Sequence, residues 1–268
     1  MINKLKITVL SENIAGKLRF LSEHGLALHL EADDKRILFD TGASNYLLIN
    51  AMQSGINLKD LDAIVLSHAH YDHTGGLANL NGNKVYIHEN FFQPKYALQD
   101  SEYKFIGVPF TRFYYKKSVG HDFIYINNSY EISPGVRLIC NFKKPKNNGH
   151  FYIKDGNNYK PDNFDDELAM TINTEKGLVI ITGCAHSGIT NIIDKAIEEN
   201  GCSKIYCLFG GFHLSKLPEK EISDIARQID QYKIKNIGIS HCTGNILAAN
   251  LKYGNVFNFN TGDSFVYL

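Results

Sequence analysis

The chain has 268 residues, of which 44% are hydrophobic, enough for one large domain or two small ones with a substantial core. Lysine and arginine together number 28, as do aspartate and glutamate, so no net charge favours nucleic acid or an anionic membrane as partner. No segment approaches the roughly 20 apolar residues that span a bilayer, and the N-terminus lacks a signal-peptide cleavage site. Five cysteines without framework spacing argue against a disulfide scaffold. We therefore expect a cytoplasmic protein.

The first half of the chain predicts strands around one helix. Short β-rich runs, separated by polar or glycine-containing turns, predict the strands. Residues 44–54 have apolar positions at helical spacing, with Ser44 as the expected N-cap and Gly55 as the stop. Residues 89–99 predict a short helical or irregular stretch. The predicted strands are LKITVL (5–10), LALHLEA (26–32), RILFDTG (36–42), DAIVLS (62–67) and KVYIH (84–88).

The segment from about 100 to 165 is the least regular part of the sequence. It contains aromatic runs that predict strands, many turns of the Asn-Gly type, and no clear helix. The segment either shapes a substrate pocket between two α/β halves or forms plain sheet with long loops, and both interpretations stay open. The basic run KKPK at 143–146 is interpreted as a solvated loop. The predicted strands here are FTRFYYKK (110–117), HDFIYI (121–126) and VRLICNF (136–142).

The second half repeats the order of the first. A hairpin of two strands is followed by alternating helices and strands, and Pro218 lies near the start of the second helix. No linker rich in proline or serine interrupts the chain, so we expect one domain over residues 1–268. The predicted strands are 168–174, 177–183, 204–211, 235–240, 256–262 and 264–268, and the predicted helices are 190–200, 217–231 and 245–254.

The densest chemical signal is SHAHYDHTGGL at residues 67–77, which contains the pattern H-x-H-x-D-H. Alternate residues of an extended segment project to the same side, so His68 and His70 can reach one ion together, while Asp72 and His73 turn toward a second. Imidazole and carboxylate suit Zn²⁺, Fe or Mn²⁺, and catalytic sites keep a position open for water. A histidine-rich surface turn is the other interpretation, but it does not require the apolar strand that precedes the cluster. The sequence therefore predicts a metal site.

Single polar residues follow predicted strands elsewhere in the chain. His186 and His241 each come directly after an apolar run, in the same context as the cluster, and we interpret them as further ligands. For His213, in GGFHL, ligation and a structural role both stay open. Asp40 also ends a strand, where its carboxylate could hold the imidazole N–H of a ligand histidine or cap its own turn.

Two pairs of residues near these positions have weaker signals. Asp166 and Glu167 could be acid/base groups or could support a ligand, but a solvated pair at the start of a strand is the preferred interpretation. Cys184 lies two residues before His186, and Cys242 directly follows His241. Either thiol could ligate a metal, yet C-x-H alone is a weak signal, and buried small thiols are the default.

In order and context, these residues resemble the motifs of the metallo-β-lactamase superfamily over nearly the whole chain. The phrases EHGLAL, ILFDTG, DELAM, TGCAHSGITNII, GGFHL and HCTG are similar to its dihydropterin synthase-like branch. The resemblance implies an α/β fold, a four-layer αβ/βα sandwich of two mixed β-sheets flanked by helices. It also implies two divalent metal ions, zinc first, with iron or manganese as alternatives. The first would be held by His68, His70 and His186, and the second by Asp72, His73 and His241.

The chain departs from the family pattern in one place. A bridging acidic ligand is expected after the strand at 204–211, where the chain offers Gly210-Gly211. The nearest candidates are His213 and Cys207. Either the metals lack a bridging carboxylate, or His213 serves as a ligand or substrate contact, and occupancy of the second site stays open.

The resemblance implies a metal-dependent hydrolase in which metal-activated hydroxide attacks a small, phosphate-containing ester. Asp72 would be a ligand and proton acceptor, and His213, His24 or a tyrosine of the middle segment would protonate the leaving group. The residues expected to contact a metal ligand or the substrate are Asp40, Glu23, His24 and Glu167.

Three other functions fit the same resemblance. They are a transferase that joins a pterin to an aminobenzene ribotide, a di-iron redox protein, and a non-catalytic metal-binding protein. We expect a small-molecule substrate and neither nucleic acid nor a membrane as partner, and a homodimer stays open. Antibiotic hydrolysis is not expected, because the sequence shows no export signal.

Overall fold

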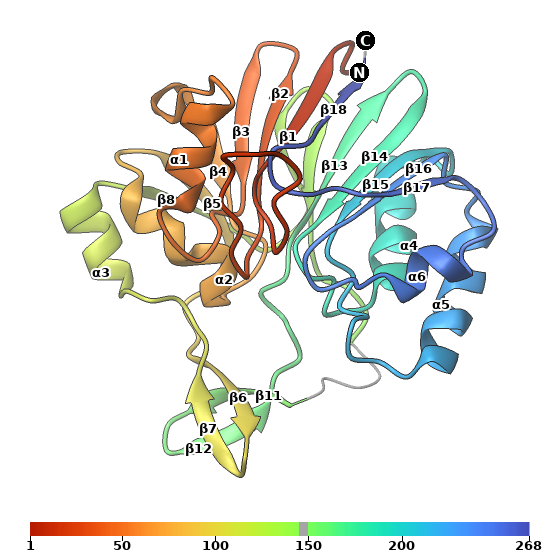
Figure 1. Cartoon of the computed structure of the whole chain (residues 1–268). Coiled ribbons are helices and arrows are strands. Elements are labelled where there is room, and N and C mark those ends of the chain that lie inside the picture. The colour runs from red at the N-terminus through yellow and green to blue at the C-terminus, as the bar shows by residue number, and fades with distance from the viewer. Residues whose placement is uncertain (145–149, 268) are drawn as a thin grey trace.

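The computed structural model describes residues 1–144 and 150–267, and its core is two mixed seven-stranded sheets that lie face to face (Figure 1). In spatial order the first sheet contains β18 (Ser264–Tyr267), β1 (Leu5–Ser11), β2 (Ala27–Ala32), β3 (Lys35–Phe39), β4 (Ala63–Val65), β5 (Lys84–His88) and β8 (Asp122–Ile126). Its strands from β3 to β8 run parallel, and the others pair antiparallel. Helical segments of this half are α1 (Tyr46–Gln53), η1 (Leu58–Asp60), α2 (Tyr71–Thr74), η2 (Gly75–Asn79), α3 (Arg112–Tyr114) and η3 (Tyr115–Val119).

The second sheet has the same combination of parallel and antiparallel strands. In spatial order it contains β17 (Asn255–Asn258), β16 (Asn236–Ile239), β15 (Ile205–Gly210), β14 (Gly177–Thr182), β13 (Ala169–Thr174), β10 (Val136–Ile139) and β9 (Tyr130–Ser133). The helices on its outer side are α4 (Ile189–Asn200), α5 (Glu219–Gln231) and α6 (Ile246–Asn250) (Figure 1). The predicted four-layer αβ/βα sandwich is confirmed. Among the described residues, no helix has the length and apolar composition that crossing a membrane requires.

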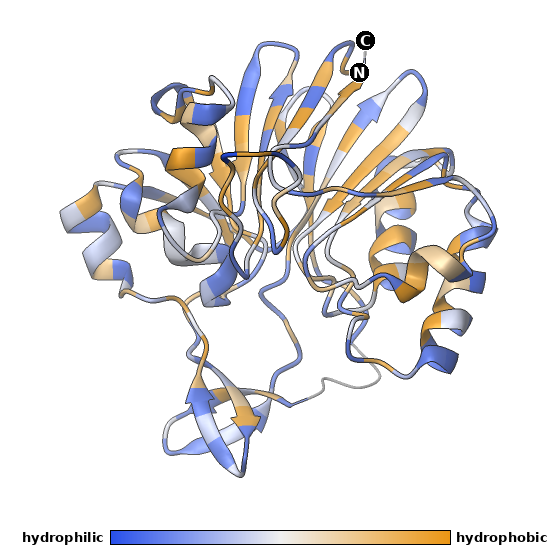
Figure 2. Ribbon diagram, in the orientation of Figure 1, coloured by the Kyte–Doolittle hydropathy of each residue, from blue (hydrophilic) through white to orange (hydrophobic). Residues whose placement is uncertain are grey.

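Alternation along the strands explains the layers. Neighbouring side chains of a strand point to opposite faces, so an apolar run buries both faces of its sheet. In β14, Val179 and Ile181 belong to the core between the two sheets, whereas Leu178 and Ile180 pack with the apolar side of α4 and α5. Figure 2 shows the strands of this sheet and the facing side of α4 as mostly hydrophobic. Each sheet is therefore held between a shared core and its own helices.

A third, four-stranded sheet projects away from the sandwich (Figure 1). Its spatial order is β12 (Asn158–Pro161), β11 (Phe151–Asp155), β6 (Lys95–Gln99) and β7 (Glu102–Phe105), all antiparallel. The prediction of a helical or irregular stretch at 89–99 is thus wrong for β6, because pairing with β7 and β11 outweighs its weak local preference. Residues 145 and 146 of the basic run at 143–146 lie outside the described residues. So does Leu268, the last residue of the predicted strand 264–268.

Two further predictions differ from the structure. Residues 110–117 form helical turns and no strand, because the Thr111 hydroxyl accepts a hydrogen bond from the Tyr114 N–H and Gly120 ends the segment in the left-handed conformation. The N-cap of α1 is Asn45 and not Ser44, whose hydroxyl donates to the Glu23 carboxylate. In both places a side-chain hydrogen bond outweighs the sequence pattern: a local one at Thr111, and one between residues distant in sequence at Ser44.

A buried ion cluster joins the projecting sheet to the sandwich. The Lys95 Nζ of β6 lies 2.8 Å from Asp162 Oδ2 and 2.6 Å from Asp166 Oδ1, and the lysine is only 1% exposed. The other oxygen of Asp166 accepts a hydrogen bond from the Ala69 N–H at 2.9 Å. Because Ala69 stands between His68 and His70, the cluster connects the projecting sheet directly to the histidine loop.

We expect Lys95→Met to lower the free energy of unfolding by about 3–5 kcal/mol, because it leaves two carboxylates buried without their cation. Urea denaturation measures the change. Lys104→Met is the matched control, since Lys104 is an exposed residue of the same sheet. A Lys95 variant as stable as this control would show that the cluster does not hold the projecting sheet in place.

Candidate metal centre

Five site segments emerge at one edge of the sandwich, each directly after a strand. Asp40 follows β3, the histidine loop follows β4, His186 follows β14, His213 follows β15 and His241 follows β16. Of these residues, Asp40, His213 and His241 have φ between 53° and 59°, a left-handed conformation that costs free energy for residues other than glycine. Such strain persists only where the surrounding contacts enforce it, and it is typical of functional sites.

The first group of imidazoles is formed by His68, His70 and His186. Their ring centroids lie 4.6 Å to 4.9 Å apart, and all three side chains are buried. Each ring has a buried Nε2 with no hydrogen-bond partner among the described residues. Burial lowers the pKa of His70 to about 3 and the pKa of His68 and His186 well below the ordinary value, so all three rings are neutral. Three neutral, unpartnered imidazole nitrogens are the donor set that a transition-metal ion requires.

The second group surrounds the carboxylate of Asp72. Its Oδ2 lies 3.2 Å from His24 Nε2, 3.3 Å from His241 Nε2 and 3.8 Å from His73 Nε2. Burial opposes the charge on Asp72, but His73 and the hydrogen bonds from His24 and His241 hold its pKa well below the usual range. His68 and His73 have ring centroids 4.3 Å apart, so the two groups are adjacent. The carboxylate is therefore ionised and available to a second cation.

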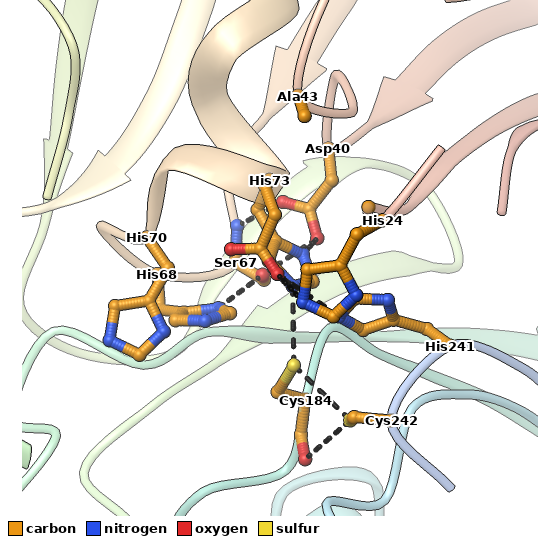
Figure 3. Close-up of polar contacts among 12 residues, drawn as sticks. His24, Asp40, Ala43, Ser67, His68, His70, His73, Cys184, His241 and Cys242 are labelled. Carbon is orange, nitrogen blue, oxygen red and sulfur yellow. Dashed lines mark hydrogen bonds and ion pairs between the residues drawn. The ribbon is translucent and has the colours of Figure 1, made fainter. Parts of the chain in front are cut away.

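The Asp40 carboxylate orients the ring of one histidine in each group (Figure 3). Its Oδ2 lies 2.7 Å from His73 Nδ1 and accepts a hydrogen bond of 2.7 Å from the Ser67 hydroxyl. Since that hydroxyl donates to Asp40, its oxygen accepts from His68 Nδ1 at 2.9 Å. Each ring thus carries its proton on Nδ1, which points toward Asp40. The Nε2 atom of each ring points the other way, toward the rest of its own group. Asp40 therefore orients one imidazole ring in each group.

Two buried glutamates hold the outlying histidine loops. Glu167 accepts hydrogen bonds from the backbone N–H groups of His186 and Ser187 at 2.7 and 2.8 Å, and burial raises its pKa to about 7. Glu12 accepts from the backbone N–H of His241 at 2.6 Å. The solvated-pair interpretation of Asp166 and Glu167 is wrong, because both side chains are buried and both bond to site segments.

Sequence reasoning missed several residues of the site. Two of them are Glu12 and Asn13, and the Oδ1 of Asn13 lies 2.9 Å from His241 Nδ1. Their only sequence signal is that they follow the first strand. Ser67 was identified only as the start of the cluster. Phe164 stacks on the His186 ring with centroids 4.0 Å apart, and Phe151 of the projecting sheet lies 5.2 Å from the same ring. These aromatic residues form an apolar wall beside the first group.

The remaining candidate residues lie at different distances from the two groups. His24 is largely exposed and contacts Asp72 directly, and the His213 ring lies 4.3 Å from the His186 ring. Glu23 binds the Ser11 hydroxyl and the Ala43 N–H, so it braces the loop after β3 rather than facing the histidines. Cys207 is buried in the core between the sheets, which removes it as a replacement for the bridging acid.

We expect Asp40→Asn to weaken zinc binding by about 10- to 100-fold, because the amide loses the negative charge beside His73 and places an NH₂ group against one of the donors that the two carboxylate oxygens now accept from. Competition against a coloured chelator, with folding checked by circular dichroism, measures the affinity. Asp34→Asn removes an exposed carboxylate at the other end of β3, away from the site, and is the matched control. Equal affinities of the two variants would contradict the role assigned to Asp40.

Comparisons with known proteins identify the family of the chain. Residues 24–188 match the family model described as the metallo-beta-lactamase superfamily. The chain is 33% identical to the 7,8-dihydropterin-6-methyl-4-(beta-D-ribofuranosyl)-aminobenzene-5′-phosphate synthase of Methanocaldococcus jannaschii, over 91% of this chain and 89% of that protein. A second, uncharacterized protein of the same organism is 32% identical over 89% of this chain and 90% of its own length.

A solved structure shares the whole fold. It is described as a metal-dependent hydrolase of the beta-lactamase superfamily, with a TM-score of 0.84 and 30% identity over 97% of this chain and 98% of that chain. Sequence and structure agree over nearly the full length of the chain. The chain belongs to the metallo-β-lactamase superfamily.

Proposed function

We propose that the protein is a metal-dependent hydrolase of a small, phosphate-containing ester. The observation that carries this proposal is the set of three buried, unpartnered Nε2 atoms of His68, His70 and His186 beside the Asp72 carboxylate. Leaving such nitrogens unpaired costs roughly 1–3 kcal/mol each, a cost that a bound cation removes. The donor set fits two divalent cations, with zinc first and iron or manganese as alternatives.

His68, His70 and His186 would hold the first ion, and Asp72, His73 and His241 the second. When bound, such ions lower the pKa of water and polarise carbonyl or phosphoryl oxygens. Asp72 would be the proton acceptor for the attacking water, because His24, His73 and His241 keep its carboxylate ionised despite burial, so that it carries no proton of its own.

Two histidines are the proposed proton donors to the leaving group. The hydrogen bond to Asp72 raises the pKa of His24, so this ring holds a proton at the exposed side of the second group. His213 lies beside His186, and its buried Nδ1 has no hydrogen-bond partner among the described residues. Either ring can supply the proton that the departing oxygen requires.

The substrate class is supported by the relatives and by the wall of the site. The Methanocaldococcus relative has a 5′-phosphate on an aromatic ribofuranosyl compound in its name. Phe151 lies within 5.5 Å of the rings of His70, His186 and His213, so the segment from 100 to 165 contributes an apolar surface to the site. This contact favours the pocket-shaping interpretation of that segment.

A second candidate is a transferase that joins a pterin to a ribofuranosylaminobenzene 5′-phosphate. The 33% identity to the synthase over 91% of the chain favours it. The same ions and histidines would then serve a different acceptor, because an amine or ring carbon would take the place of water. Incubation with both reactants distinguishes the two functions by mass spectrometry, since a joined product indicates the transferase and a water-cleaved product indicates the hydrolase.

We expect the zinc-loaded protein to hydrolyse at least one member of a panel of phosphomonoesters, phosphodiesters, thioesters and lactones. Asp72→Asn should lower kcat on the active compound by on the order of 100-fold or more, since it removes a proton acceptor and a metal ligand together. Asp34→Asn should leave kcat unchanged. A protein that holds two metals per chain and is inert on every ester would overturn the hydrolase proposal.

A further inference from the structure

No acidic side chain fits at the position where the family pattern expects the bridging ligand. Gly210 has a φ of 124°, and a Cβ on it would lie 2.0 Å from the Thr182 carbonyl oxygen. A Cβ on Gly211 would lie 2.5 Å from the Gly183 carbonyl oxygen and 2.7 Å from Cys242 Sγ. The space next to Gly211 is thus filled by a thiol, and neither glycine can be replaced by aspartate without moving the backbone.

Cys184 occupies the position between the two groups of histidines (Figure 3). Its Sγ and the ligand nitrogens of His68 and His186 all lie within 4.8 Å of one another, and the same holds for Sγ with His73 and His241. The side chain is only 3% exposed, and Sγ lies 3.2 Å from His73 Nε2. Ligand atoms on one tetrahedral zinc ion lie about 3.6 Å apart when one is sulfur and the other nitrogen. Cys184 Sγ therefore lies within 4.8 Å of ligand nitrogens from both groups, and its distance to His73 Nε2 is already within the range of ligands on one ion.

We propose that the Cys184 thiolate is the bridging ligand of the dinuclear centre and replaces the carboxylate that the family pattern expects. The inference rests on the metal-binding part of the proposed function and goes beyond it in naming the ligand. The unpartnered Nε2 atoms of His68 and His186 point independently to a cation beside this sulfur. Ligation breaks the S–H bond, the proton leaves to solvent, and the electron pair stays on sulfur.

Cys242 lies beside the proposed thiolate, and its Sγ, the Cys184 Sγ and a ring nitrogen of His213 all lie within 4.8 Å of one another. The Cys242 Sγ donates a hydrogen bond to Cys184 Sγ at 3.3 Å and accepts one from the His213 N–H at 3.2 Å. Both cysteines are free thiols. A thiol that donates to a neighbouring sulfur stabilises negative charge there.

A sulfur bridge also determines which metals the site prefers. Thiolate is a soft ligand that binds zinc and iron well, whereas manganese prefers carboxylate, carbonyl and water oxygens. The proposal therefore predicts that zinc or iron is retained and that manganese binds weakly.

Two spectroscopic measurements test the bridge. The cobalt-substituted protein should show a thiolate-to-metal charge-transfer band in the near ultraviolet, which Cys184→Ser should abolish while lowering affinity for the second equivalent at least about tenfold. Cys242→Ser and Cys202→Ser should keep the band, since the first exchanges a thiol donor to Cys184 for a hydroxyl donor and the second removes a thiol outside the site. A band that persists in the Cys184 variant, or disappears only with Cys242, overturns the proposal.

X-ray absorption on the zinc-loaded wild-type protein provides the second test and does not depend on folding of the variant. A bridge gives one sulfur at about 2.3 Å for every zinc ion. A terminal ligand gives one sulfur for two zinc ions, and that result, or no sulfur at all, contradicts the bridge while leaving the proposed hydrolase intact. Absence of bound metal by elemental analysis overturns both proposals.

Discussion

The hydrogen bonds of one buried carboxylate determine how this site is arranged. Asp40 binds His73 directly and reaches His68 through the Ser67 hydroxyl, so a single residue orients one ring of each group. Its Oδ1 also accepts the Ser67 N–H at 2.7 Å, which fixes the first residue of the histidine loop to the end of β3. Both loops would rearrange if this carboxylate were lost, because no other acceptor among the described residues contacts His73 Nδ1 and Ser67 together.

The two sheets bring the remaining parts to the same edge. Parallel neighbours such as β3 and β4, or β14, β15 and β16, end on the same side, so the residues that follow them are close in space although distant in sequence. Glutamates then hold the backbone of the outlying histidines, Glu167 for His186 and Glu12 for His241. Each glutamate binds the backbone of its loop and not the imidazole ring, so the ring nitrogen proposed to bind metal is left free of it.

The sequence was sufficient for the parts of the fold and site that depend on local patterns. Apolar runs marked nearly every strand of the two large sheets, and the spacing within 67–73 identified the histidine loop. The sequence was insufficient where pairing between distant strands or a single hydrogen bond determines the local structure. β6 forms a strand only because β7 and β11 pair with it, and residues 110–117 are helical because Thr111 caps them. Glu12 supports His241 from 229 positions away, a relation that no local pattern contains. Likewise, the sequence did not predict that Cys184 lies between the two groups of histidines, because that position depends on the fold.

The proposed function requires that this edge of the sandwich binds two metal ions between its histidines. A crystal structure of the zinc-loaded protein, with anomalous difference maps calculated on both sides of the zinc absorption edge, tests it most directly. We expect one peak in contact with the Nε2 atoms of His68, His70 and His186, and a second beside Asp72, His73 and His241. Maps without a peak at the first group, with its imidazole nitrogens bonded to water or to other side chains instead, would contradict the account.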